Sequence, residues 1–539
     1  MPLANSLTHD GMEYNSSATA TIRSVQGWSL RRVVGSLVHY PAAWLAEQAI
    51  IAEPVAILTK RFSTRPPEKS QMHPTSQFAV HFDDEARSNA VRDIIANTEP
   101  HSLRTFTPSQ AVLAKSAGVF HWTPEGRRLY DFSSGVLVAN LGHNPKRWMN
   151  RFTNYLGWNP SVMSSTEDGF FQAVSLTAYN AMTELEAVAS QRLIANLQAS
   201  PGGSRLTSVI WAASGSEAVQ KALWACMKRD PDREGIIATR FGFHGKKGLS
   251  GAVTGSEEDA DRDPRVHFIS FPREECSDID SPSKAFDPAV YRAELDRVWT
   301  TSNGTIGCLI TEPYLGGGGS FHPPKAYLQL LQAFCREHDI LFILDEVQSN
   351  FGRTGQMYAF ESYGIEPDFV CLGKGLGNGI PVSAAVGRRD VCDPMGYGAT
   401  SDTWSANPLS SAAVLATLDE FESTDILQRT RHLHDIFLKG LRRLKETGVI
   451  INVRGEGMVF GLECGPLGTL NANQVANAVV ERCYLGHPGH DGIHLLGPLA
   501  NCVIRISPPM CMTDSDANVS LGLLFEFVSD VGQRLRSSL

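Results

Sequence analysis

Short apolar segments alternate with stretches of helical period through the middle of the chain, from about residue 166 to residue 391. Most of these segments end at a turn that carries glycine or an acidic residue, and a helical pattern follows. The predicted strands are Leu206–Trp211, Gly235–Ala238, Val266–Ile269, Ile306–Thr311, Ile340–Leu344 and Phe369–Leu372. The alternation predicts an α/β domain on a largely parallel sheet, in which ligands bind where the strands end.

The segments on either side of this block carry other patterns. Between Ala111 and Asn144, β-branched and aromatic residues surround a Pro124-Glu-Gly126 turn, which predicts a β-hairpin. Beyond Ser411 the predicted elements are helices at Ser411–Phe421 and Ile426–Thr447, strands at Ile450–Val453, Met458–Glu463 and Val503–Ile506, and a helix between the last two strands. We therefore expect a large domain at residues 166–410, a smaller C-terminal α+β domain at residues 411–539, and a segment at residues 72–165 that joins the small domain.

The composition is that of an ordinary globular protein, with 42% hydrophobic and 19% charged residues. The 539 residues exceed the roughly 250–300 that one hydrophobic core supports, so at least two domains are expected. A net charge of −9 gives no general attraction to nucleic acid or to a membrane surface, and favours small-molecule chemistry. The 10 cysteines include no C-x-x-C pair, so we expect free thiols and no metal site.

Residues 1–71 differ from the rest of the chain because acidic residues are scarce there. Between Tyr14 and Pro67 only Glu47 and Glu53 are acidic, against six basic residues. A mitochondrial transit peptide fits this pattern, but so does a poorly packed extension or a mispredicted start, with Met72 as the true initiator. The same glutamates interrupt the apolar stretch, which argues against a membrane span. We expect a cytoplasmic protein, or a mitochondrial one if this extension is a transit peptide.

Two turns in the large domain could hold an anion and a planar ring. Ser214-Gly-Ser-Glu-Ala218 lies between a predicted strand and a predicted helix at Val219–Lys228, where small residues let backbone N–H groups approach an anion. An ordinary serine N-cap accounts for the same residues. In Phe241-Gly-Phe-His-Gly245 an aromatic ring could stack on a planar ligand, although core packing is its more common role.

Two ionisable residues follow predicted strands at the edge where ligands are expected. Asp345 ends an apolar strand, and its burial requires a cationic partner. A metal-binding acid of a nucleotide hydrolase is the rival, but no Gly-x-x-x-x-Gly-Lys-Ser/Thr loop accompanies it. Lys374 lies between glycines, where enclosure lowers the pKa toward a nucleophilic amine; a solvated loop lysine is the usual alternative. Together these residues supply what pyridoxal phosphate requires. They offer a binding site for its phosphate, an aromatic ring to stack on its ring, an acid for its pyridine nitrogen, and an amine that can attack its aldehyde.

Several motifs follow one another in a fixed order: Asp131-Phe-Ser-Ser-Gly135, Glu312-Pro313, Asp345-Glu-Val-Gln348, Phe351-Gly-Arg-Thr-Gly355, Gly373-Lys-Gly375 and Thr403-Trp-Ser-Ala-Asn-Pro408. This set resembles the class III (subgroup II) aminotransferases, and among them the 4-aminobutyrate and ω-amino acid aminotransferases. The resemblance runs from about Gly118 to Thr513. It implies a pyridoxal-phosphate-dependent transaminase of fold type I that works as a homodimer, with active sites at the subunit interface.

The resemblance also implies a set of residues around the cofactor. Lys374 would carry the cofactor and move a proton at the substrate, while Asp345 would keep the pyridine nitrogen protonated. Gln348 would bind the ring hydroxyl. The remaining implied contacts are Val347 and Phe243 on the two ring faces, Gly215 and Ser216 at the phosphate, Thr403 of the partner subunit, and His244 and Glu312.

On the substrate side the resemblance implies Arg505, Lys246 and Val136, with Arg505 gripping the α-carboxylate by two parallel hydrogen bonds. Two departures bear on specificity. Gly317 stands where glutamate-using members have a glutamate that covers this arginine, and Lys246 stands where 4-aminobutyrate aminotransferases have an arginine. Lysine meets a carboxylate only as a point charge. We expect an ω-amino acid or similar primary amine as the amino donor and a 2-oxo acid (pyruvate or 2-oxoglutarate) as the acceptor. The alternative is that the same site catalyses decarboxylation, racemisation or phosphate elimination.

Overall fold

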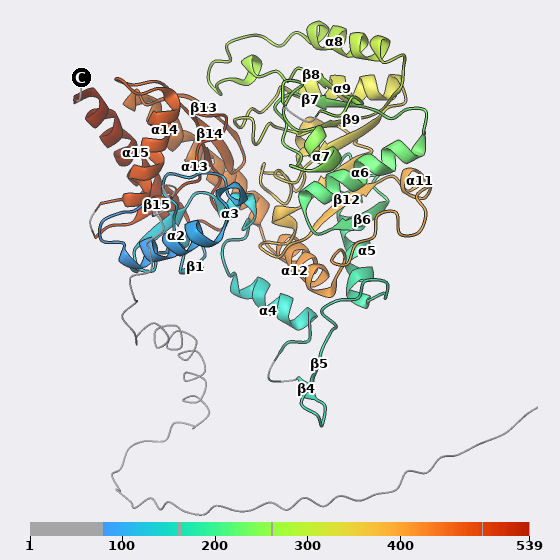
Figure 1. Cartoon of the computed structure of the whole chain (residues 1–539), viewed down its shortest axis with the longest axis horizontal. Coiled ribbons are helices and arrows are strands. Elements are labelled where there is room, and N and C mark those ends of the chain that lie inside the picture. Colours follow the sequence, from blue (N-terminus) through green and yellow to red (C-terminus); the bar gives the residue numbers. More distant parts are fainter. Residues whose placement is uncertain (1–78, 160, 162, 260–261, 488, 538–539) are drawn as a thin grey trace, which may run out of the picture. The chain divides into compact units, whose positions relative to one another are not determined.

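The computed structural model describes residues 79–159, 161, 163–259, 262–487 and 489–537 (Figure 1). The extension predicted at residues 1–71 lies outside these residues. The domain boundaries inferred from the sequence stay predictions. Among the helices in the described ranges, none has both the length and the apolar character needed to cross a membrane.

In the described part of the chain a seven-stranded sheet contains all the strands predicted for the middle block, in the order β6-β12-β11-β10-β9-β7-β8. Its strands are β6 (Ser208–Ala212), β7 (Gly235–Thr239), β8 (Val266–Ile269), β9 (Ile306–Thr311), β10 (Leu341–Asp345), β11 (Phe369–Leu372) and β12 (Ser383–Gly387). Neighbours are parallel except β12, which is antiparallel to β6 and β11, so the prediction of a largely parallel sheet is confirmed. The sequence did not reveal β12 because four of its five residues are serine, alanine or glycine, which give little strand signal.

Side chains of the central strands alternate between two apolar layers. In β10, Leu341 and Ile343 pack into the layer that contains α6 (Gly215–Arg229), whereas Phe342 and Leu344 pack into the layer of α9 (Lys325–Glu337) on the opposite face. Asp345 follows this alternation and therefore belongs to the face that α6 covers. The first turn of α6 begins on the same side.

Further helices surround the seven-stranded sheet, and Figure 1 shows α6, α7 and α9 next to its strands. They are α4 (Lys146–Tyr155), α5 (Glu184–Ala199), α7 (Gly248–Ala252), α8 (Pro288–Thr301), α10 (Ala359–Tyr363), α11 (Arg389–Cys392) and α12 (Pro408–Ser423). Helix α12 packs against α4 and α5. Trp148 Nε1 donates to Thr417 Oγ1 (2.9 Å), and Arg192 pairs with Asp419 (2.7 Å). Short elements complete this part: α3 (Ser134–Leu137), β4 (Ser164–Ser165), β5 (Phe171–Gln172), η2 (Glu274–Cys276) and η3 (Lys374–Leu376).

Two smaller sheets have the orders β1-β2-β3-β15 and β13-β14-β16. The first combines strands from both ends of the described chain, whereas the second contains only strands from its C-terminal part. Their strands are β1 (Lys115–Ala117), β2 (Phe120–Trp122), β3 (Arg128–Asp131), β13 (Ile450–Glu456), β14 (Val459–Cys464), β15 (Gly492–His494) and β16 (Val503–Ile506). The accompanying helices are α2 (Ala86–Thr98), η1 (His101–Leu103), α13 (Ile426–Arg443), η4 (Leu444–Thr447), α14 (Ala472–Leu485) and α15 (Asp514–Ser537). The predicted hairpin is confirmed as antiparallel β2 and β3.

A buried carboxylate shapes the turn after β3. Asp131 Oδ1 accepts hydrogen bonds from Ser133 N (2.7 Å), Ser133 Oγ (2.7 Å) and Ser134 N (3.1 Å). Gly135 and Val136 follow with left-handed backbone (φ 58° and 68°), and Val136 is 40% exposed. The turn thus presents an apolar side chain at the surface while its base is tied to the sheet.

Candidate active site

The carboxyl ends of the parallel strands bring several predicted residues to one edge of the large sheet. β10 ends in Asp345, β11 is followed by Gly373 and Lys374, and β6 leads into α6. Ser214 caps α6: its hydroxyl accepts from Glu217 N at 3.3 Å. The serine N-cap is therefore present, and the N–H groups at the start of α6 remain available to an anion at this edge.

Asp345 has a hydrogen-bonding partner in His244, a residue that can carry the positive charge expected beside it. Its Oδ2 lies 2.7 Å from His244 Nδ1, and its Oδ1 accepts from Val347 N at 3.0 Å. Burial disfavours the charged imidazole, but the hydrogen bond and the charge of Asp345 outweigh it and raise the pKa of His244 above its ordinary value. The sequence placed His244 near the cofactor without showing this pairing.

Glu312 organises the two loops that face Asp345. One of its oxygens accepts from Phe243 N (2.9 Å) and the other from Gly316 N (3.2 Å). Burial raises the pKa of Glu312 to about 7. Phe243 is thereby held by its backbone, while its ring stays 42% exposed and free to pack on a ligand.

Two glycines create close approaches that any side chain would block. A Cβ on Gly215 would lie 2.9 Å from Val347 Cγ1, and one on Gly316 would lie 2.3 Å from Gln348 Oε1. Gly215 therefore lets the start of α6 lie against Val347, and Gly316 leaves room for the amide of Gln348. The sequence did not show that position 316 in particular must lack a side chain, because Gly316 is one of four consecutive glycines.

Lys374 has a constrained backbone, and its surroundings disfavour the protonated form of its amine. Its φ is 48°, in the left-handed region, and it begins η3 directly after Gly373. Burial, followed by repulsion from the Arg505 guanidinium, lowers the pKa of Lys374 to about 8. The described structure gives its amine no hydrogen bond or ion pair. A nucleophilic amine is the chemistry that this environment favours.

Arg505 on β16 reaches the same region from the β13-β14-β16 sheet. It is only 6% exposed, so it is not a surface arginine, and its Nη1 donates to Gln348 Oε1 at 3.4 Å. Burial lowers the pKa of Arg505, and its Nε has no partner among the described residues. Tyr314, which sequence reasoning did not single out, has an equally unpartnered buried hydroxyl, and the charge of Arg505 acts on it. Its position just after Glu312-Pro313 was the available signal.

Three predicted residues are exposed in the single chain, unlike Asp345, His244 and Arg505. They are Thr403, Lys246 and Val136. The loop of Thr403 is anchored nearby by Lys221, whose Nζ lies 2.6 Å from Asp402 Oδ2. Their predicted roles are not tested by these positions.

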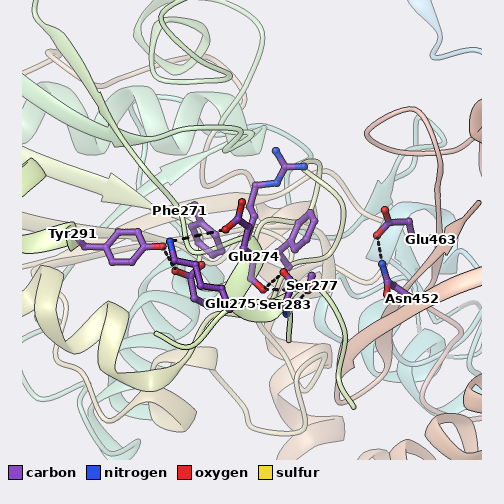
Figure 2. Close-up of a pocket in the computed structure, with 11 residues that line it drawn as sticks. Phe271, Glu274, Glu275, Ser277, Ser283, Tyr291, Asn452 and Glu463 are labelled. Carbon is purple, nitrogen blue, oxygen red and sulfur yellow. Dashed lines mark hydrogen bonds and ion pairs between the residues drawn. The ribbon is translucent and has the colours of Figure 1, made fainter. Parts of the chain in front are cut away.

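A separate cavity of about 520 Å³ contains none of the predicted site residues (Figure 2). It is lined by Phe271, Arg273, Glu274, Glu275, Ser277, Ser283, Lys284, Tyr291, Phe321, Asn452 and Glu463. Polar groups within it already pair with one another: Tyr291 Oη donates to Glu275 Oε1 (2.8 Å) and Asn452 Nδ2 to Glu463 Oε2 (3.2 Å). The unpartnered amine of Lys374 lies outside this cavity.

Comparisons with known proteins point to one family. The family described as "Aminotransferase class-III" matches residues 104–527. The acetylornithine aminotransferase of Oceanobacillus iheyensis is 27% identical over 438 residues, covering 80% of this chain and 96% of that protein. The 5-aminovalerate aminotransferase DavT of Pseudomonas aeruginosa is 29% identical over 438 residues, covering 79% and 95%. An amine transaminase from an uncultivated Pseudomonas species, solved in its PLP-bound form, shares the fold with a TM-score of 0.66 at 24% identity, covering 87% of this chain and all of that one.

Proposed function

Because the chain belongs to the class III aminotransferases, whose cofactor is pyridoxal phosphate, we propose that it moves an amino group from an ω-amino acid or a similar primary amine to a 2-oxo acid. The observation that carries the proposal is the meeting of Lys374, the Asp345–His244 pair and the first turn of α6 at one sheet edge. The 5-aminovalerate relative supports an ω-amino donor, while the acetylornithine relative keeps a longer diamine-type donor open.

The residues fit pyridoxal phosphate on structural grounds. Gly215 lies so close to Val347 that a side chain at position 215 would not fit. Such a glycine suits a backbone that binds a phosphate directly. Phe243 is half exposed, and Gln348, which accepts a hydrogen bond from Arg505, would bind the ring hydroxyl. An amine without a partner completes the set at Lys374.

The protein's own residues would divide the work as follows. When bound, pyridoxal phosphate supplies an aldehyde that takes up an amino group and a ring that accepts electrons from the adjacent carbon. Asp345, paired with His244, would hold a proton at the pyridine nitrogen, because a buried carboxylate stabilises positive charge facing it. Lys374 would hold the cofactor and, as a free amine, would take a proton from the substrate carbon and return it. Val347 and Phe243 would orient the ring.

The phosphate would lie at the start of α6, bound by the N–H groups of Gly215 and Ser216 and by Thr403 of the partner subunit. Two exposed aromatic residues on the same loop support burial against a second chain: Trp404 is 65% exposed and Tyr397 fully exposed in the single chain. Light scattering of the holoenzyme tests the homodimer, and a monomeric mass for an active enzyme would remove this part of the proposal.

Arg505 would bind the carboxylate of the oxo acid, and Lys246 and Val136 would line the path of the donor. A Cβ on Gly317 would lie 3.1 Å from Phe243 Cβ, so a covering glutamate at this position would crowd that side chain. Because glycine occupies this position, no side chain of residue 317 covers Arg505, which favours a donor that needs no switching of that arginine.

The test of the proposed function follows the amino nitrogen. The holoenzyme is given a 15N-labelled ω-amino acid or diamine together with an unlabelled 2-oxo acid. Transamination puts the label into the new 2-amino acid in a one-to-one ratio with the aldehyde formed from the donor. Release of carbon dioxide or phosphate, or inversion of the donor without label transfer, would instead select decarboxylation, elimination or racemisation as the activity.

We also infer a cytoplasmic enzyme, with mitochondria as the alternative if residues 1–71 are a transit peptide. Fusing residues 1–71 to a fluorescent reporter distinguishes the two. A reporter that stays diffuse in the cytoplasm supports the first location, and one that enters mitochondria overturns it.

The lowered pKa of Lys374 predicts how the cofactor-free protein takes up pyridoxal phosphate. Only the neutral amine attacks an aldehyde, so below about pH 8 the attachment rate should rise about tenfold per pH unit and then level off near that value. Stopped-flow absorbance on cofactor-free protein measures it. A rate that keeps rising past pH 9, as for an ordinary lysine, would contradict the assignment of the amine's environment.

Arg505→Lys should raise KM for the oxo acid by about 10- to 100-fold, because one charge-assisted hydrogen bond to the carboxylate is lost. Steady-state kinetics with a donor that lacks a carboxylate provide the comparison, since KM for that amine should change little. The matched control is Arg297→Lys at an exposed helix position, where both constants should stay unchanged. Equal effects of Arg505→Lys on both substrates would remove the carboxylate role.

A further inference from the structure

Three buried side chains of the β1-β2-β3-β15 sheet converge on one point. In the strand pairing His121 of β2 lies opposite Leu129 of β3, and His494 of β15 lies beside Asp131. Because side chains alternate between the faces of a sheet, His121, Asp131 and His494 point to the same face. One nitrogen of each histidine and one carboxylate oxygen lie within 4.8 Å of one another.

The nitrogens that face this point have no hydrogen-bond partner among the described residues. They are His121 Nε2 and His494 Nδ1, in side chains of residues only 2% and 8% exposed. His121 Nδ1 is engaged with Ser116 Oγ at 2.7 Å, which leaves Nε2 directed at Asp131 Oδ2, 3.5 Å away. Buried polar atoms are almost always satisfied, so two orphaned nitrogens around one carboxylate call for a shared ligand.

We propose that His121 Nε2, Asp131 Oδ2 and His494 Nδ1 bind one Zn²⁺ ion. Zinc binds imidazole nitrogen at about 2.0–2.1 Å with tetrahedral geometry, so two of its ligand atoms lie about 3.3 Å apart. The 3.5 Å between His121 Nε2 and Asp131 Oδ2 is close to this separation. Imidazole and carboxylate donors in a buried site suit zinc better than magnesium or calcium, which prefer oxygen ligands alone.

The surroundings of these residues hold the ligands in place. His143 Nε2 lies 2.7 Å from the same oxygen of Asp131, and Ser116 orients the ring of His121. Such supporting hydrogen bonds are typical of metal sites, where they fix the direction of the ligand lone pairs. The ligands come from strands far apart in the sequence, which is why no compact motif revealed them.

The ion would tie three strands to the turn that presents Val136. The other oxygen of Asp131 builds this turn through Ser133 and Ser134. Zinc therefore stabilises the β1-β2-β3-β15 sheet and the turn together, a structural role that does not depend on the reaction catalysed at Lys374.

Metal analysis of the full-length holoenzyme, produced without a histidine tag, tests the proposal. After incubation with zinc chloride and desalting, mass spectrometry of the elements should find about one zinc per chain. His494→Gln and His121→Gln should each retain less than about a tenth of that amount. The matched control is His490→Gln, an exposed histidine four positions before His494, which should retain all of it. A parent enzyme without zinc, or His494→Gln with its zinc intact, overturns the site.

Cobalt provides a spectroscopic measurement on the parent enzyme itself. Loading the metal-free parent holoenzyme with Co²⁺ should produce the visible d–d bands of a tetrahedral site. It should also raise the melting temperature above that of the metal-free holoenzyme. The same bands and the same shift should be missing from a folded His494→Gln variant. Absence of the bands from the parent protein, or their survival in that variant, would refute the assignment.

Discussion

Lys374→Ala should fold and bind pyridoxal phosphate without a covalent bond, yet transfer amino groups at least about 10⁴-fold more slowly than the parent enzyme. The variant loses both the amine that holds the cofactor and the base that moves the substrate proton. Stability should not fall, because burial and the charge of Arg505 already disfavour the ammonium. Turnover under saturating substrates and the melting temperature measure the two effects.

Reduction with borohydride locates the attachment directly. In the parent enzyme the pyridoxyl group should be found by peptide mass spectrometry on the lysine at position 374, and nowhere in Lys374→Ala. Lys325→Ala removes an exposed lysine at the start of α9 and should leave attachment and turnover unchanged. Attachment to another lysine, or substantial turnover by Lys374→Ala, would overturn the central assignment of the site.

Asp345→Asn should lower kcat by about 10²- to 10⁴-fold while preserving the shape of the site. The amide cannot supply the negative charge that holds a proton at the pyridine nitrogen, and His244 loses the partner that raises its pKa. Turnover and the pH profile of the cofactor absorbance provide the measurement. Asp339→Asn, at an exposed position just before β10, should leave both unchanged.

A double-mutant comparison distinguishes the coupling between Asp345 and His244 from an unspecific loss of activity. His244→Gln should slow the parent enzyme but have little further effect in the Asp345→Asn background, because the 2.7 Å contact joins them into one unit. Additive effects would mean that His244 acts independently of the carboxylate. An unchanged kcat in Asp345→Asn would remove the proposed role of the acid.

Much of the framework was predictable because it depends on local patterns. Val503–Ile506 was predicted as a strand and β16 has the same bounds, and the stretch Ile426–Thr447 contains α13 followed by η4. Strand β12 escaped prediction because its serine, alanine and glycine residues lack the bulky apolar side chains by which the equally buried β10 and β11 were recognised. The free cysteines expected from their spacing are free throughout the described residues.

The sequence by itself determined the kinds of residue that chemistry can use and the edge at which they gather. Lys374 follows a strand between glycines and Asp345 ends one, so a parallel sheet, whose strands end at one edge, was enough to place both residues at that edge. Only the tertiary structure decided which atoms meet: His244 with Asp345, Arg505 with Gln348, and His121 with Asp131 and His494. The physical reason is that periodicity reports burial along one segment, whereas pairing of buried polar groups depends on side chains delivered from segments that are distant in the chain.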